Sequence, residues 1–221
     1  MSEQLGLPPP AEVRRRIDRI ENVQVRNCFR IAYLYAGRIS EVVSVGYGRD
    51  VPRGPRGTDV KMASYEMGSV KEPAVVFVVK TAKRQGRPRL IGLPVNYEPW
   101  ALPLYDYFQE RGDDFVFPFS RQVAYEAARR AFYGLVYNIE PYYWHKKYDT
   151  ESVIRHLKPF TDHALRHERA SELVEFYGFD GVDLGIYGGW TLRTAARMPT
   201  MVDRYLELGW QRYFPKLLKR R

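Results

Sequence analysis

The chain has 221 residues, of which 45% are hydrophobic, so it is long and apolar enough to fold as a domain with its own core. Its 35 basic and 26 acidic residues give a formal charge of +9, which favours polyanionic partners, nucleic acid first among them. The single cysteine, Cys28, excludes an intramolecular disulfide and a thiolate-rich zinc site, and the longest apolar run, residues 74–79, is far too short to cross a bilayer. We therefore expect a cytoplasmic protein without a membrane partner.

The first part of the chain predicts helices followed by a loop. Residues 11–37 carry apolar side chains at helical spacing, and Gly37 ends or bends this stretch. The run VVSV at 42–45 favours an extended segment, with Ser40 as a candidate cap before it. Residues 48–59 are rich in Gly, Pro and Arg, a composition typical of a loop.

Two β-branched runs come next. Residues 75–79 (VVFVV) predict a buried strand, and residues 88–95 (PRLIGLPV) predict its partner. The turn between them, residues 80–87, is strongly basic. Such a strand pair would form a finger able to reach a phosphate.

From residue 98 onward the sequence predicts mostly helix. The expected helices cover 102–112, 117–138 with Ser120 as N-cap, and 162–178 with Gly178 as C-cap. One or two further helices and a basic tail complete the chain. The buried positions expected in the helix at 162–178 are Ala164, Leu165, Leu173 and Phe176. The predicted fold class is mainly α with a small antiparallel β-sheet, an α+β protein.

The stretch TDHALRHERASELVEFYG, residues 161–178, is unusual for a helix that must also build a core. It places four basic or imidazole side chains within seven residues, which is ordinarily only a solvated face. Other parts of the chain supply candidate partners for it. In chain order the set is Arg38 in GRISE, Lys80 at a strand end, His163 and Arg166 one helical turn apart, Trp190 in YGGW, and Tyr205 in VDRYLEL.

The order of these motifs resembles the tyrosine recombinases, the phage integrase family, with archaeal-type integrases as one subgroup. GRISE is followed by a strand-end KT with basic residues and LP, then by HALRH, then by GGW and a tyrosine. The resemblance covers about residues 12–210 and corresponds to the catalytic domain of that family. It implies one catalytic domain over 1–221 with the catalytic-domain fold of that family, a basic C-terminal tail at 211–221, and no N-terminal core-binding domain.

The function implied by the resemblance is site-specific recombination. Such an enzyme cuts and rejoins DNA through a 3′-phosphotyrosine intermediate, without metal, cofactor or ATP. The implied partners are double-stranded DNA and further copies of the chain, as a tetramer on two DNA sites that passes through a Holliday junction. The implied location is the nucleoid, whether the gene is cellular or viral.

The chemistry explains why these residue types are needed. A tyrosine oxygen can attack a phosphodiester and hold the broken end, and Tyr205 is the expected nucleophile. The guanidinium groups of Arg38 and Arg166 would each donate two hydrogen bonds to the charged phosphorane oxygens. The resemblance implies that Lys80 protonates the leaving 5′-oxygen and that His163 bonds the phosphate or assists proton loss from the tyrosine.

The remaining residues have expected roles around this centre. Trp190 would donate its indole N–H to a phosphate oxygen, while Glu41 and His167 would support the site through hydrogen bonds. The candidates for DNA-phosphate contacts are Lys83, Arg84, Arg87 and Arg169. No metal is expected, because His145 and His156 have no carboxylate or thiol partners at ligand spacing.

Several alternatives stay open. Arg38, Lys80 and Trp190 each have an ordinary structural reading, as a surface ion pair, a solvated lysine and a core residue. Tyr205 lies fifteen residues after Trp190, a longer gap than the family usually has, so Tyr213 is an alternative nucleophile. The alternative functions are DNA relaxation of the type IB topoisomerase kind and a catalytically inactive DNA-binding regulator. A basic RNA-binding domain would leave the ordered series unexplained.

Overall fold

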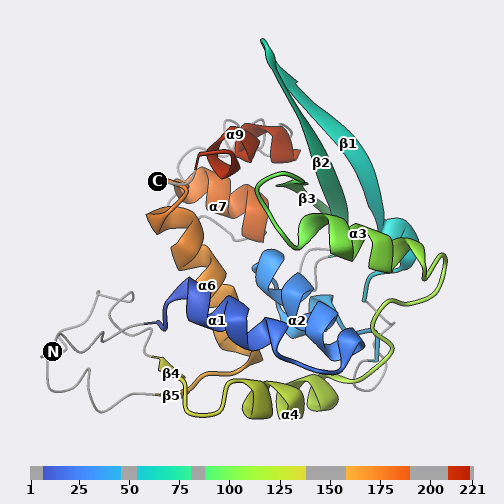
Figure 1. Ribbon diagram of the computed structural model, residues 1–221, viewed down its shortest axis with the longest axis vertical. Coiled ribbons are helices and arrows are strands. Elements are labelled where there is room, and N and C mark those ends of the chain that lie inside the picture. Colours follow the sequence, from blue (N-terminus) through green and yellow to red (C-terminus); the bar gives the residue numbers. More distant parts are fainter. Residues whose placement is uncertain (1–6, 46–53, 81–87, 138–157, 190–208, 220–221) are drawn as a thin grey trace, which may run out of the picture.

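The computed structural model describes residues 7–45, 54–80, 88–137, 158–189 and 209–219. In these ranges helices surround a small antiparallel sheet, which confirms the predicted α+β class. Figure 1 shows α1, α2 and α6 at the centre, α4 below them, and the sheet with α3, α7 and α9 at the other end. None of the helices within the described ranges is long and apolar enough to span a membrane.

Two helices open the described chain, as the apolar spacing predicts. They are α1, Pro10–Asp18, and α2, Val23–Leu34. Proline stands at the first position of α1, where its missing N–H costs nothing. The side chain of Asn22 caps α2 by accepting a hydrogen bond from the Val25 N–H at 3.0 Å. The chain then turns through Ala36, with φ at +43°, into the short 3-10 helix η1, Ile39–Glu41.

The sheet has three antiparallel strands in the order β1-β2-β3. They are β1, Val60–Met67, β2, Val70–Val79, and β3, Arg89–Pro94, and β1 is preceded by η2, Gly57–Asp59. The predicted pairing of β2 with β3 is confirmed, and the basic turn at 81–87 lies outside the described residues.

Two strand predictions need correction. The sequence pattern missed β1, whose residues alternate too irregularly to predict a strand. The β1–β2 hairpin projects well beyond the body of the molecule (Figure 1). It turns at Gly68, where φ is +60°. The predicted extended segment at 42–45 is confirmed only at its end, because Val42 is helical, whereas the Ser44 and Val45 N–H groups donate to the Phe117 and Phe119 carbonyls.

The predicted helices of the second half are confirmed in their central parts, but the helix predicted over 117–138 covers only 121–131, and residues 136–137 form a strand instead. The helices are α3, Ala101–Gln109, α4, Arg121–Ala131, α6, Asp162–Glu175, and α7, Gly181–Gly188. Ser120 caps α4 as predicted, since its Oγ accepts from the Val123 N–H at 3.4 Å. Gly178 adopts positive φ after α6, as a C-terminal glycine should. A two-stranded pairing of β4, Val136–Tyr137, with β5, Lys158–Pro159, lies between α4 and α6.

The C-terminal segment belongs to the core. It forms η5, Gly209–Arg212, and α9, Phe214–Leu217, which pack on β3. The side chains of Tyr213, Phe214 and Leu217 are buried, and Trp210 covers Gly92 so closely that a Cβ there would lie 2.3 Å from the indole. The expectation that the core ends at 210 and that a free basic tail begins at 211 is therefore wrong through residue 217.

The helix α6 is buried on more than one side, and some of its charged side chains form ion pairs inside the protein. Toward α1 it presents Arg169 and Glu172, which form an ion pair with each other. Arg14 of α1 joins them through Glu172, at 3.4 Å, and through Glu98, at 2.9 Å. Satisfied charges of this kind are tolerated in a core, whereas removal of one partner typically costs about 3–5 kcal/mol.

Candidate active site

The GRISE motif forms a tight turn after α2. The Glu41 carboxylate reaches back to accept a hydrogen bond from the Arg38 backbone N–H at 3.1 Å. Gly37 is required by close approach, because a Cβ there would lie 2.9 Å from Oε2 of Glu41 and 3.3 Å from a guanidinium nitrogen of Arg89. The side chain of Arg38 is 39% exposed, so its guanidinium is available to a ligand from solvent.

The helix α6 brings Arg166 to this turn. Arg166 donates a hydrogen bond from Nη1 to the Ala36 carbonyl at 2.8 Å, which joins α6 to the end of α2. Burial lowers the pKa of Arg166 to about 10, with Glu41 acting against this shift and the like charges of Arg89 and Arg38 adding to it. Residues more than a hundred positions apart in the chain therefore act on one another electrostatically here.

His163 and His167 lie one turn apart on the same helix. Their Nε2 atoms are 3.3 Å apart, so one ring donates to the other and each ring sets the tautomer of its neighbour. Burial lowers the pKa of His163; Asp162 opposes this effect, and the cations Arg166 and Arg38 reinforce it. Burial, together with His163, lowers the pKa of His167 to about 4. Both rings are therefore neutral near pH 7.

Arg89 is a member of this cluster that the sequence did not reveal. It is the first residue of β3 and is buried, whereas its neighbour Leu90 is 37% exposed. Its Nη2 lies 3.2 Å from Oε2 of Glu41, and burial lowers its pKa while Glu41 opposes that effect. An arginine followed by a run of apolar residues predicts that the apolar side chains are buried and the arginine is exposed. Nothing in the local sequence therefore indicated that Arg89 would be buried.

Arg121 is a second residue that the sequence reasoning missed. It stands at the first position of α4 and acts electrostatically on both Asp162 and His163. A cation in the first turn of a helix is opposed by the helix dipole. That local conflict is a signal that could have found it, because residues that break a local rule concentrate at functional sites.

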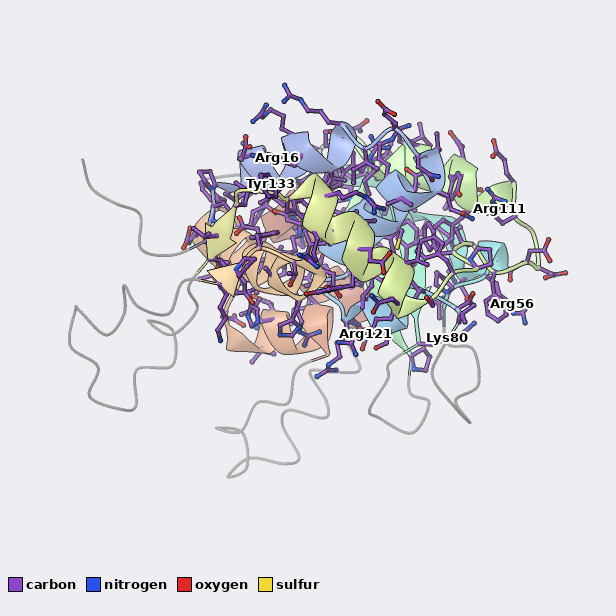
Figure 2. The ribbon with its side chains drawn as sticks, turned by 90° about the horizontal axis from the view of Figure 1, so that it is seen from below. Arg16, Arg56, Lys80, Arg111, Arg121 and Tyr133 are labelled. Carbon is purple, nitrogen blue, oxygen red and sulfur yellow. The ribbon has the colours of Figure 1, made fainter. Side chains whose placement is uncertain are left out.

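Lys80 follows the end of β2 and has a carboxylate partner. Its ammonium nitrogen lies 2.6 Å from Oδ2 of Asp59, and its side chain is 46% exposed. Figure 2 shows Lys80 and Arg121 along the same edge of the molecule. Asp59 in turn acts on the buried Tyr35, the residue whose carbonyl accepts from Arg89 at 3.1 Å. Lys80 is therefore linked to the cluster through Asp59.

Some predicted site residues are placed elsewhere. The expectation that Arg169 contacts DNA phosphate is wrong, because its side chain is 1% exposed and bound to Glu172. Tyr213 is unsuitable as a nucleophile, since its buried hydroxyl accepts from the Gly92 N–H at 3.1 Å and burial raises its pKa well above the usual value. The predicted residues outside the described ranges are Lys83, Arg84, Arg87, Trp190 and Tyr205.

The cluster is suited to hold an anion. It combines the guanidinium groups of Arg38 and Arg166 with the Glu41 carboxylate, which Arg89 binds from inside the protein, and two neutral imidazoles lie at its edge. Arginine stays charged at any physiological pH and presents donors in a planar fork that matches phosphate oxygens. Among the residues that the structure describes, no group of three or more His, Cys, Asp or Glu side chains could hold a metal ion.

Comparison with known proteins adds no family to this description, since no protein-family model, no curated protein and no solved structure matches the chain.

Proposed function

We propose that this protein is a DNA strand transferase of the tyrosine recombinase kind, which cuts and rejoins DNA through a covalent bond to tyrosine. One observation carries the proposal. Arg166 of α6 donates a hydrogen bond at 2.8 Å to the Ala36 carbonyl, in the turn that carries Arg38, and His163 stands one turn before Arg166 on the same helix. These are the residue types that a phosphoryl transfer without metal requires.

The proposed step is in-line attack on a phosphodiester. The phenolic oxygen of Tyr205 bonds to phosphorus, and the bond from phosphorus to the 5′-oxygen breaks. The tyrosine proton passes to neutral His163 or to water, and the 5′-oxygen takes a proton from an acid. The phosphotyrosine keeps the energy of the broken bond, so attack by a 5′-hydroxyl reverses the step without ATP.

Arg38 and Arg166 would act on the charge that develops at phosphorus. Hydrogen-bond donors aimed at a transition-state oxyanion are each worth about 2.7–4 kcal/mol of activation free energy. Arg166 is buried and held by the Ala36 carbonyl, so its orientation is set before DNA binds. Arg38 is partly exposed and completes the pair from the solvent side.

Lys80 would protonate the leaving 5′-oxygen only after its ion pair opens. Its ammonium is bound to Asp59 at 2.6 Å, and a carboxylate at that distance competes with the DNA for the same proton. Binding of DNA would therefore have to draw Lys80 away from Asp59. The ion pair with Asp59 would therefore keep Lys80 inactive until DNA binds.

Covalent trapping tests the proposed chemistry. Nicked duplexes with sequences from the protein's own locus let the cut end diffuse away, so that a protein–DNA adduct accumulates. We expect an adduct with the natural chain, none with Tyr205→Phe, and an unchanged yield with Tyr133→Phe. Tyr133 is the matched control because its side chain is 83% exposed and lies outside the cluster.

The arginine clamp is tested in the same assay. Arg166→Ala should slow adduct formation by about 10²–10³-fold while DNA binding is largely retained. Arg38→Ala, at a partly exposed position, gives the same test without a buried cavity. Natural rates in both variants would exclude the clamp.

Other outcomes distinguish the related functions. Adduct formation together with relaxation of supercoiled DNA that carries no second site would indicate topoisomerase activity. Tight, salt-sensitive binding with no adduct would indicate a DNA-binding regulator.

A further inference from the structure

We propose that Arg89 is a positioning residue, which holds the turn that carries Arg38 in fixed register with the end of α7. This inference rests on the proposed function, because the segment that follows α7 contains Trp190 and Tyr205. It assigns to Arg89 no contact with DNA. Its action on the reaction would pass through the two backbone segments that it joins.

The hydrogen bonds of Arg89 end on two segments far apart in the chain. Nη1 donates to the Tyr187 carbonyl at 2.8 Å, in the last turn of α7. Nη2 donates to the Tyr35 carbonyl at 3.1 Å and to the Glu41 carboxylate at 3.2 Å, on either side of Arg38. One planar group therefore sets the distance between the end of α7 and the turn after α2.

Glu41 passes this constraint on to Arg38. The carboxylate oxygen that accepts from Arg89, Oε2, also accepts from the Arg38 backbone N–H at 3.1 Å. Movement of the Arg89 guanidinium would shift Glu41 and with it the start of the Arg38 side chain. A lysine could not replace this geometry, because one ammonium cannot reach two carbonyls and a carboxylate in a single plane.

The chain at Gly189 is packed directly on the Arg89 side chain. Gly189 caps α7 in the left-handed conformation, with φ at +65°, and a Cβ there would lie 3.3 Å from Cδ of Arg89. Residue 190 follows at once in the sequence. The last described residue after α7, Gly189, is thus fixed against Arg89.

The test compares Arg89→Gln and Arg89→Lys with Arg16→Gln. Arg16 is a matched control, since its guanidinium also binds two carbonyls, of Ala131 and Tyr133, and one carboxylate, of Glu12, on the edge of the molecule opposite Lys80 and Arg121 (Figure 2). Three quantities are measured for each variant: the single-turnover rate of adduct formation at saturating nicked DNA, the Kd for that DNA, and the thermal unfolding midpoint. Amide hydrogen exchange is followed over residues 35–41 and 183–189.

We expect Arg89→Gln to slow adduct formation by about 10²-fold, the effect of a misplacement of roughly 1 Å, with Kd changed by less than about threefold. Arg89→Lys should be intermediate. Arg16→Gln should lower the unfolding midpoint without slowing the reaction. Exchange should speed up in both segments together in Arg89→Gln and in neither segment in Arg16→Gln.

The rate measurement and the exchange measurement together distinguish failure of this inference from failure of the proposed function. Equal rates in Arg89→Gln and Arg16→Gln, or unchanged exchange in Arg89→Gln, would overturn the positioning role. If the natural chain forms no adduct, the proposed function fails, and the exchange measurement still decides whether Arg89 couples the two segments.

Discussion

At the scale of single residues, Glu168 and Glu172 are glutamates on neighbouring turns of α6 whose surroundings shift their pKa values in opposite directions. Glu172 is paired with Arg169 and Arg14, and although burial acts in the opposite direction, these cations lower its pKa to about 2. Glu168 is equally buried, and among the described residues its Oε2 has no hydrogen-bond partner. Burial, with Glu172 and Glu175 adding to it, raises the pKa of Glu168 to about 8.

This raised pKa predicts a pH dependence of stability. Between its ordinary pKa of 4.5 and about 8, Glu168 keeps a proton in the folded protein that the unfolded chain releases, so the free energy of unfolding falls as pH rises through this window. Glu168→Gln removes the titration. In urea unfolding, we expect the free energy of unfolding of the variant to rise relative to that of the natural chain from pH 5 to pH 8, by on the order of 3 kcal/mol. The control is Glu110→Gln at an exposed position after α3, and parallel curves for Glu168→Gln and the natural chain would refute the assignment.

At the scale of elements, the docking of η5 and α9 on β3 depends on a glycine, Gly92, because it leaves room for the Trp210 ring. The Trp210 ring lies on Gly92, and the Tyr213 hydroxyl bonds to both the Gly92 N–H and the Leu90 carbonyl. Further along, Phe214 packs against Tyr65 of β1 with ring centroids 4.8 Å apart. The C-terminal segment thereby covers the part of the sheet from which the long hairpin projects.

Gly92→Ala should therefore loosen this segment. The added methyl group would meet the indole at 2.3 Å, so Trp210 has to move, and such overpacking typically costs about 1–3 kcal/mol of folding free energy. We expect a lower unfolding midpoint, a red shift of tryptophan fluorescence, and faster amide exchange over 209–218. Leu90→Ala, at an exposed position of the same strand, is the control. Unchanged exchange in Gly92→Ala would show that the contact does not hold the segment.

At the scale of the whole molecule, the charge of +9 should appear as salt dependence. If DNA is the ligand, each phosphate neutralised contributes about −0.9 to the slope of log K against log salt, so a chain that covers about five phosphates has a slope near roughly −4.5. Fluorescence anisotropy from about 50 to 200 mM salt measures this. A flat response would argue against DNA.

The same measurement tests whether Arg121 contacts DNA. Arg121→Ala should reduce the slope by about one unit, the share of one phosphate contact. Arg15→Ala on α1, where the arginine is paired with Glu12, should leave the slope unchanged. Equal slopes for all three proteins would remove Arg121 from the DNA-binding surface.

Local patterns are enough where local chemistry decides the outcome. The helices α1, α2, α3, α4 and α6 follow from apolar spacing and caps such as Ser120, and β2 and β3 follow from their β-branched runs. The three-residue spacing of His163 and Arg166 is sufficient to predict that both side chains lie on one side of a helix. Arg38 is marked by its glycine and by Glu41 within one short turn.

The errors arise where the deciding contact comes from elsewhere in the chain. Arg169 lies on the same helix as Arg166 and looks equally basic, yet only the packing of α2 and α7 against α6 shows that it is bound to Glu172 and surrounded by tyrosine rings, those of Tyr33, Tyr177 and Tyr187. Tyr213 is an available nucleophile by sequence and a core residue by structure, because β3 offers it Gly92.

The helices, the central strand pair, the positive charge and the local motifs all follow from the amino-acid sequence, because propensity, periodicity and capping act over a few residues. Three features required the folded chain: the place of Arg89 in the cluster, the closure of the C-terminal segment over the sheet, and the choice of which α6 arginines face the candidate site. Burial of a charge depends on partners brought together from distant parts of the chain. No window of sequence contains that information.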